Sequence, residues 1–315
     1  MFGFIKFIQR LLERLRANKR LWFTTIFLIS VFGISASIFF LTLMTGSISK
    51  EVYKNQVLEY KQRYEAMVKF KETSMQKCSL VVLNDKTFID ALRRNDIATA
   101  EKSLETLNKT LSEHGFEKTH IAFKSVNAPN LKNTENTVMK TKNTIFGLEV
   151  FSDGVFYTYL TPVVVDDNAL GLIEIRSSID NIFTSFSNLN QEFVFFLNKS
   201  MAVHIALEQR NENYESFNDS LLLDNRVFNS SLTRELKELS SDKYSEFLDS
   251  GYYLTRSYYA AHIDIEDTNG IPMGMIVLAE DKYKESGFVN IINKMKNQVI
   301  LVALGLIVSI LLFMF

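Results

Sequence analysis

The sequence predicts an α+β fold: a long helix followed by two antiparallel sheets, held between two membrane-spanning helices. Three observations lead to this prediction. An uncharged apolar stretch lies near each end of the chain, a polar stretch with helical periodicity follows the first, and short strand-like runs separated by turns fill the middle. The order helix, strands, hairpin, helix occurs twice, without a sequence period regular enough to define a repeat.

The first apolar stretch predicts a transmembrane helix over residues 21–46. Residues 1–20 carry six basic side chains against one acid, and no charge follows until Lys50. The apolar run is longer than the roughly 7–15 residues of a signal peptide, the alternative interpretation, and it reaches the roughly 20 residues that span a bilayer. The basic cluster predicts that tail 1–20 lies in the cytoplasm, and Trp22 is typical of an interfacial anchor.

The second apolar stretch, 299–315, has seventeen residues without a charge and predicts a second transmembrane helix. A tail anchor or a buried core helix are the alternatives. We expect an output module to start where this helix returns to the cytoplasm. The central residues, about 250 of them, would then lie outside the inner membrane, with both ends in the cytoplasm.

Residues 47–82 predict a long amphipathic helix that continues the first span outward for some 50 Å. Its apolar side chains recur every three or four residues: Val57, Tyr60, Tyr64, Met67, Met75, Cys78 and Val82. This stripe offers a surface to the same helix of a second copy, which predicts a homodimer, or it packs on the chain's own sheet. Cys78, the only cysteine, excludes an internal disulfide, and its place on the stripe predicts a small core residue.

Between the long helix and the second span, periodicity and turn residues predict the remaining elements. Helices are expected over 86–114, 178–189, 224–231, 233–239 and 282–298. Strands are expected over 120–126, three times within 145–176, as a hairpin of 193–197 with 202–207, and over 252–264 and 274–279. The centre of the prediction is 145–176, where the turns Ser152-Asp153-Gly154 and Asp166-Asp167-Asn168 separate three strands.

Composition and motifs favour a binding domain over an enzyme. The net charge of −1 gives no reason to expect a nucleic-acid partner. No phosphate-binding loop, nucleophile elbow, CxxC or HExxH is present, and the four histidines lack the spacing of metal ligands. We therefore expect no catalytic activity, metal or cofactor, and look instead for a pocket.

Strand parity within 145–176 defines the candidate pocket. Ile173 and Ile175 share an apolar face that should pack on the long helix. We assign the other face to a small polar or charged ligand, since buried charges require partners; its predicted ligand-binding residues are His120, Lys124, Glu149, Tyr157, Tyr159, Glu174 and Arg176. The alternative is that Glu174 and Arg176 pair with neighbouring strands while the tyrosines only pack.

The run GLEVFSDGVFYTYLTPVVVDDNALGLIEIRSSIDNIF resembles the double-Cache group of extracellular sensor domains in bacterial transmembrane receptors. The resemblance rests on Gly147-Leu148-Glu149-Val150, Gly154, Pro162-Val163 and Gly171-Leu172-Ile173-Glu174. The later run YYAAHIDIEDTNGIPMGMIVLAED resembles the closing hairpin of a membrane-proximal Cache subdomain. The chain departs from the group at Phe123-Lys124-Ser125, where a His-Leu-Pro type segment is common.

The resemblance implies two PAS-like Cache subdomains, a membrane-distal one over 83–190 and a membrane-proximal one over 191–284, followed by an exit helix over 285–298. It implies the input half of a chemotaxis receptor that binds a small molecule and signals through the second span. A sensor histidine kinase or a diguanylate cyclase would share the same ectodomain. From a different class, a membrane-anchored adaptor that binds a protein partner is the alternative.

Overall fold

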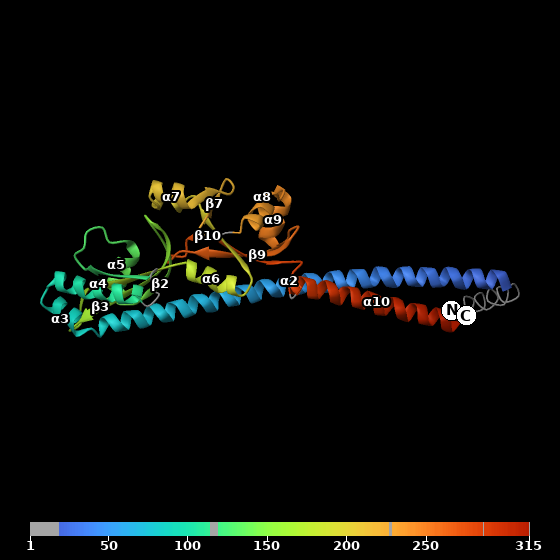
Figure 1. The fold of residues 1–315 in the computed structure, drawn as a ribbon, viewed down its shortest axis with the longest axis horizontal. Helices are drawn as coiled ribbons and strands as arrows, with labels where there is room; N and C mark the ends of the chain where they lie inside the picture. The colour runs from blue at the N-terminus through green and yellow to red at the C-terminus, as the bar shows by residue number, and fades with distance from the viewer. Residues whose placement is uncertain (1–18, 114–118, 227–228, 286, 315) are drawn as a thin grey trace, which may run out of the picture. The chain divides into compact units, whose positions relative to one another are not determined.

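The computed structural model describes residues 19–113, 119–226, 229–285 and 287–314, so the predicted tail 1–20 lies, apart from its last two residues, outside the described residues. It divides into two compact units (Figure 1). Unit one contains Met1–Asn55 and Lys282–Phe315, and unit two contains Gln56–Asp281. Helix α2, Lys19–Leu83, begins in unit one and ends in unit two.

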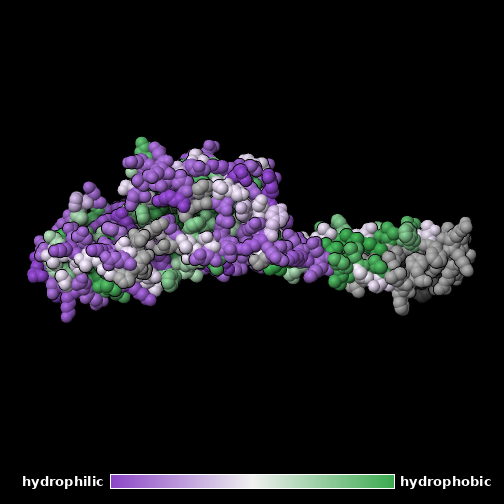
Figure 2. Space-filling view, viewed as in Figure 1, coloured by the Kyte–Doolittle hydropathy of each residue, from purple (hydrophilic) through white to green (hydrophobic). Residues whose placement is uncertain are grey.

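Unit one consists, in its described part, of the first portion of α2 and of α10, Phe288–Met314. Large apolar side chains are exposed on both helices, and Figure 2 shows them as a green surface. They include Phe27, Phe32, Phe39, Phe40, Leu43, Leu301 and Val302. So many exposed apolar groups would be unfavourable in water. Among the described residues, Val31–Leu83 is the stretch that contains a window long and apolar enough to cross a membrane. The second span over 299–315 falls in α10 and stays a prediction, and the helix predicted from residue 282 begins at Phe288.

Unit two contains a first sheet of four antiparallel strands in the order β1-β4-β3-β2, as the strand pattern predicted. Its strands are β1 Thr119–Ser125, β2 Ile145–Phe151, β3 Gly154–Val165 and β4 Asn168–Ser178. The single helix expected over 86–114 is two helices, α3 Lys86–Arg93 and α4 Ile97–Glu113. The chain breaks between them because Asn95 has a φ of 55°, which ends a helix.

The two faces of this sheet have different neighbours. Ile173 and Ile175 share a face with Tyr157, and the Tyr157 hydroxyl lies 2.8 Å from that of Tyr64 on α2. The predicted packing of the isoleucine face on the long helix is therefore correct. The opposite face is covered by α5, Asn133–Thr141, a helix that the sequence did not predict.

A second sheet of six antiparallel strands follows in the order β6-β7-β5-β10-β9-β8. Its strands are β5 Glu192–Asn198, β6 Tyr214–Ser216, β7 Leu221–Asp224, β8 Tyr252–Leu254, β9 Tyr258–Glu266 and β10 Pro272–Asp281. The expected hairpin of 193–197 with 202–207 is wrong, because β5 pairs with β7 and β10. The segment after β5 is a short 3₁₀ turn, Ala202–His204, followed by α7, Leu207–Asn213.

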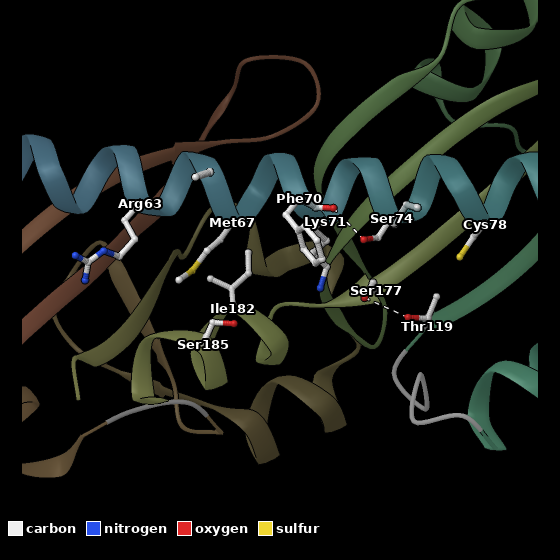
Figure 3. Close-up of a pocket in the computed structure, with 12 residues that line it drawn as sticks. Arg63, Met67, Phe70, Lys71, Ser74, Cys78, Thr119, Ser177, Ile182 and Ser185 are labelled. Carbon is white, nitrogen blue, oxygen red and sulfur yellow. Dashed lines mark hydrogen bonds between the residues drawn. The ribbon is translucent and has the colours of Figure 1, made fainter. Parts of the chain in front are cut away.

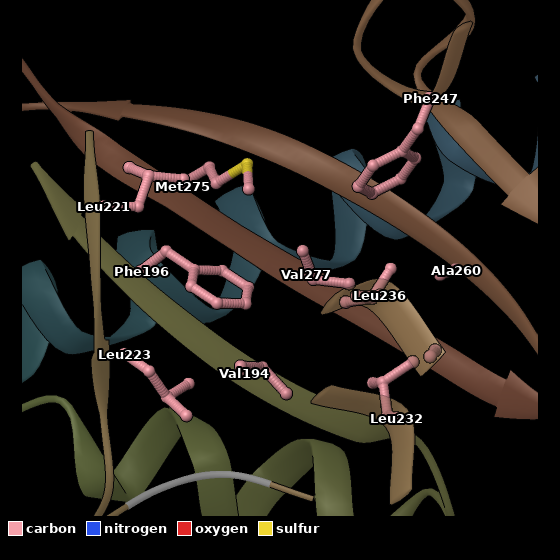
Figure 4. Packing of buried hydrophobic residues seen from close by; sticks show 11 residues of the cluster. Val194, Phe196, Leu221, Leu223, Leu232, Leu236, Phe247, Ala260, Met275 and Val277 are labelled. Carbon is pink, nitrogen blue, oxygen red and sulfur yellow. The ribbon is translucent and has the colours of Figure 1, made fainter. Parts of the chain in front are cut away.

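Helices α8, Ser230–Lys237, and α9, Ser241–Ser250, cover one face of the second sheet (Figure 4). Their Leu232, Leu236 and Phe247 bury against strand residues such as Phe196 and Val277. The helix expected over 224–231 is wrong at its start, because Asp224 ends a strand. On the other face, Tyr60 of α2 packs edge-on against Tyr259, and α6, Asp180–Asn188, contributes Phe186 against Phe193.

The apolar stripe of the long helix is therefore largely used inside unit two. Tyr60, Tyr64, Met75 and Val82 are all buried there. Of the two interpretations of the stripe, packing on the chain's own sheets is the one that these residues satisfy, while the homodimer stays a prediction.

Candidate ligand-binding site

The first sheet carries its charges on the face below α5. Val138 and Met139 of α5 pack with Leu160 and Leu172 of the sheet. Leu160 pairs with Glu174 in register, so both side chains belong to this face. The face is thus apolar under the body of α5 and charged beside the first turn of that helix.

Glu174 is the central acid, with a side chain only 1% exposed. It accepts hydrogen bonds from Lys124 Nζ at 2.7 Å and from Arg176 Nε at 2.5 Å. Lys124 also donates to Glu135, which lies in α5 and accepts from the backbone N–H of Lys132 at 2.9 Å. Lys124 therefore ties the sheet to the start of α5.

These contacts set the ionisation of the cluster. Burial alone would raise the pKa of Glu174, but Lys124 and Arg176 outweigh it and hold that pKa below its ordinary value of 4.5. Burial alone would lower the pKa of Lys124, and its bonds to Glu135 and Glu174 raise it overall. Both groups are charged at neutral pH.

Glu149 of β2 is a second buried acid, and side chains from two other segments donate to it. Thr134 Oγ1 and Lys132 Nζ, from the start of α5, each donate at 3.0 Å. Thr268 Oγ1 donates at 3.0 Å from the turn between β9 and β10 of the second sheet. One carboxylate therefore contacts the segment that covers the first sheet and the hairpin that belongs to the second.

The hairpin turn also fits the backbone of β2. The Thr268 N–H donates to the carbonyl of Leu148 at 3.1 Å. A Cβ on Gly147 would lie 2.9 Å from Thr268 Cγ2, so the glycine leaves the space that the threonine methyl occupies. The position of Thr268 on the charged face is therefore set by both strand and turn.

An aromatic ring and an unpaired hydroxyl complete the face. Lys132 Nζ and the Arg176 guanidinium lie 3.5 Å and 3.6 Å from the centroid of the Phe151 ring, as cation–π contacts. Thr158, which pairs with Arg176 in register, is fully buried, and its hydroxyl has no hydrogen-bond partner among the described residues. Buried hydroxyls normally have one.

The structure brings five of the predicted ligand residues to one face: His120, Lys124, Glu149, Glu174 and Arg176. Of these, His120 is exposed on the edge strand β1, beside a hollow that α4 lines. The ligand role of all seven predicted residues stays a prediction.

The expectation that Tyr157 and Tyr159 share this face is wrong. Tyr159 pairs with Ile175, and both tyrosines are buried on the side of α2. The reason is a β-bulge after Val163, where the register between β3 and β4 shifts by one residue. A shift of one residue moves every preceding side chain of the strand to the opposite face.

Sequence reasoning missed the residues of this face that do not belong to its strands: Lys132, Thr134, Glu135 and Thr268. Glu135 occupies the third position of α5, where an acid is part of a helix-capping signal. The N-cap position, where this signal usually has Ser or Thr, holds Lys132. Thr268 lies in the turn between β9 and β10, and no local pattern in the sequence indicates where a turn docks.

The sequence matches no family model and no curated protein. Solved structures with a similar fold include the extracellular domain of a protein described as the histidine kinase vpHK1S-Z8, with 12% identity and a TM-score of 0.44 over 75% of this chain and 97% of that one. A domain of a sensory box/GGDEF family protein from Vibrio parahaemolyticus has 10% identity and a TM-score of 0.42 over 74% and 96%. The sensor domain of the V. cholerae histidine kinase DctB has 12% identity and a TM-score of 0.34 over 70% and 100%.

Two of these three neighbours are described as the extracellular or sensor domain of a histidine kinase. All three TM-scores lie below 0.5. Within the described part of the chain, no three His, Cys, Asp or Glu side chains are grouped so that they could hold a metal ion.

Proposed function

We propose that this chain is the ligand-sensing part of a transmembrane signalling receptor, and that it binds a small polar or charged molecule on the charged face of the first sheet. The observation that carries the proposal is the shared carboxylate of Glu149, which accepts hydrogen bonds from the covering segment and from the hairpin of the second sheet. A movement of the Glu149 side chain would therefore alter contacts with the segment covering the first sheet and with the hairpin of the second sheet.

The cluster is balanced without a ligand, with three carboxylates and three cations: Glu135, Glu149, Glu174, Lys124, Lys132 and Arg176. A ligand with a carboxylate or an ammonium group therefore has to replace one of these partners. Glu135 is the natural group to leave, because it is the acid contributed by the covering helix. The buried Thr158 hydroxyl offers a further polar contact.

Signalling follows from differential affinity, since a ligand shifts an equilibrium only toward the conformation that it binds more tightly. Movement of the α5 segment would change the contacts of Lys132 and Thr134 with Glu149, and so the docking of Thr268. The β9–β10 hairpin would carry this change, because β10 is followed in the chain by α10 and the proposed second span.

We also propose where unit two lies in the cell and what kind of output it controls. Unit two would lie outside a bacterial inner membrane, in the periplasm or the extracellular space, with a cytoplasmic output of the chemotaxis type. A homodimer would have to use the part of α2 that unit two leaves exposed, where Leu80 and Val81 are about half exposed. A kinase or cyclase output would use the same input.

A thermal-shift screen of the full chain in lipid nanodiscs tests the binding site. Amino acids, dicarboxylates and small amines are the probes. We expect at least one probe to raise the unfolding midpoint of the wild type and to lose that effect in Arg176→Gln. The matched control is Arg93→Gln, which removes an exposed arginine paired with Asp90. If no probe stabilises the chain while a partner protein binds it through the sheets, the adaptor alternative replaces the sensor.

A further inference from the structure

A groove of about 450 Å³ lies along α2, on the opposite side of the first sheet from the charged cluster. Met67 and Phe70 of α2 form one wall, and Ile182 of α6 forms another (Figure 3). Met75 of α2 also lines the groove. The Phe70 side chain stands at its rim and is 76% exposed. The volume falls within the roughly 300–1,000 Å³ of small-molecule sites.

The charged side chains that line this α2–α6 groove are all basic. Arg63 and Lys71 line it, and no acid is among its described lining residues. Arg63 is already paired, since it donates to Glu59 at 2.7 Å and to Gln191 at 3.1 Å. Lys71 forms no such ion pair with any described residue.

Lys71 is the unusual group, because it is 8% exposed and carries its charge into the inner part of the groove. Its Nζ donates one hydrogen bond, to the carbonyl of Ser178 at 2.6 Å, and lies 5.4 Å from the centroid of the Tyr157 ring. An ammonium group has three N–H donors, and a buried charge without an opposite charge is unfavourable. Burial lowers the pKa of Lys71 to about 8, against a smaller opposing effect of Asp180.

Two hydroxyls lie beside the lysine at the sheet end of the groove. Thr119 Oγ1 and Ser177 Oγ are 3.4 Å apart, and Ser177 precedes the residue whose carbonyl Lys71 contacts. Figure 3 shows Lys71, Ser177 and Thr119 together, with Phe70 and Met67 on the helix side. One end of the groove thus offers hydrogen-bond donors, and the rest offers apolar carbon and sulfur.

We propose that the α2–α6 groove is a second binding site, which takes an amphipathic carboxylate: a molecule with one carboxylate at Lys71 and an aromatic or short aliphatic body against Met67, Phe70 and Ile182. The carboxylate supplies the charge that the described lining lacks. The site is independent of the charged face and does not rest on the function proposed above. Its occupant contacts α2, α6 and the sheet, so it holds the helix against the domain.

Cys78 makes the test specific to this site, because it is the only cysteine of the chain and lines the groove. The rate of its alkylation by N-ethylmaleimide is measured on the full chain in lipid nanodiscs, with 4-phenylbutyrate as probe. At ten times the dissociation constant, the unoccupied fraction falls about tenfold, and we expect alkylation to slow by that factor. The alcohol 4-phenylbutanol, which lacks the charge, should protect weakly at the same concentration.

Four variants separate the causes. Lys71→Met should lose the preference for the acid over the alcohol, while Lys77→Met, on an exposed part of the same helix, should keep it. Phe70→Ala keeps the charge and should weaken protection by both probes, which gives a second test if Lys71→Met does not fold. Arg176→Gln, at the charged face, should leave the protection unchanged.

Equal protection by acid and alcohol in the wild type would overturn the proposal, as would full protection by the acid in a folded Lys71→Met. Protection that grows with protein concentration in the absence of a probe would also overturn it, because a second copy of the chain would then cover the groove. A slower rate with the acid alone, lost in Lys71→Met and kept in Lys77→Met, supports it.

Discussion

Glu174 determines how the charged face responds to pH. Its folded-state pKa lies below the ordinary value of 4.5, because the bonds from Lys124 and Arg176 outweigh burial. A group with a lowered folded-state pKa adds stability above its unfolded-state pKa, and this contribution is lost as pH falls through the folded-state value. The cluster should therefore stabilise the first sheet at neutral pH and weaken below about pH 4.5.

We expect Glu174→Gln to lower the free energy of unfolding by about 2 kcal/mol at pH 7, because two partly buried cations lose their hydrogen bonds to a shared charged partner. The difference from the wild type should start to shrink as pH falls below 4.5, where the carboxylate of the unfolded chain is protonated, and should vanish below the lower folded-state pKa of Glu174. Thermal unfolding of the full chain from pH 7 to pH 4 measures both effects. Glu215→Gln, which removes an exposed partner of Lys237, should cost under about 1 kcal/mol at either pH; a pH-independent loss in Glu174→Gln would contradict the assignment.

The hydroxyl pair of Tyr64 and Tyr157 joins α2 to the first sheet through one buried hydrogen bond of 2.8 Å. Burial raises the pKa of Tyr64 to about 12, although its bond to Tyr157 lowers it, so the hydroxyl is neutral at physiological pH. We expect Tyr64→Phe and Tyr157→Phe each to cost about 1 kcal/mol. The double variant should cost no more than either, since the second substitution removes a hydroxyl that has already lost its partner. Additive losses in thermal unfolding would show that the two hydroxyls act separately.

At the scale of elements, the docking of the β9–β10 hairpin on β2 depends on a glycine. Gly147→Ala would place a Cβ 2.9 Å from Thr268 Cγ2 and push the turn away. We expect a loss of about 1–3 kcal/mol, although the same change in an unhindered strand should be neutral or stabilising. Thermal unfolding measures the loss.

The rescue variant for this prediction is Thr268→Ser. Serine lacks the Cγ2 methyl but keeps the hydroxyl that donates to Glu149. In the Gly147→Ala background it should recover most of the lost stability, whereas Thr268→Val, which keeps the methyl and loses the hydroxyl, should not. If both replacements rescue equally, the methyl contact is not the cause.

How far the sequence predicts these elements depends on whether their signals are local. The first sheet was predictable because turn residues such as Asp166 and Asp167, both with positive φ, mark its hairpin. The face on which Tyr159 lies was not predictable, because the bulge after Val163 results from strand pairing and not from composition. Helix α5 was missed because the short segment 133–141 has few apolar residues, of which Val138 and Met139 pack on the sheet. Strand parity could identify the residues of the charged face that belong to strands. It could not identify Thr268, because the contact of Thr268 with Glu149 joins segments far apart in the sequence.

At the scale of the whole molecule, a sensing role depends on which side of the membrane each part of the chain lies. The basic residues of the first twenty, Lys6, Arg10, Arg14, Arg16, Lys19 and Arg20, favour a cytoplasmic N-terminus. If the helix stretch beginning at Val31 then crosses the bilayer once, unit two must lie on the opposite side. A sensor of external molecules requires this arrangement, and unit two on the cytoplasmic side would exclude such a sensor.

Single cysteines in a Cys78→Ser background distinguish the two arrangements. Asn127→Cys is exposed in unit two, and Gln9→Cys belongs to the basic tail. In intact spheroplasts, we expect a membrane-impermeant maleimide to label Asn127→Cys at once and Gln9→Cys only after the membrane is permeabilised. Each cysteine serves as the control for the other, because lysed cells should label both. Labelling of Gln9→Cys but not Asn127→Cys in intact spheroplasts would place the charged face in the cytoplasm. The ligand of this face would then have to be a molecule from inside the cell.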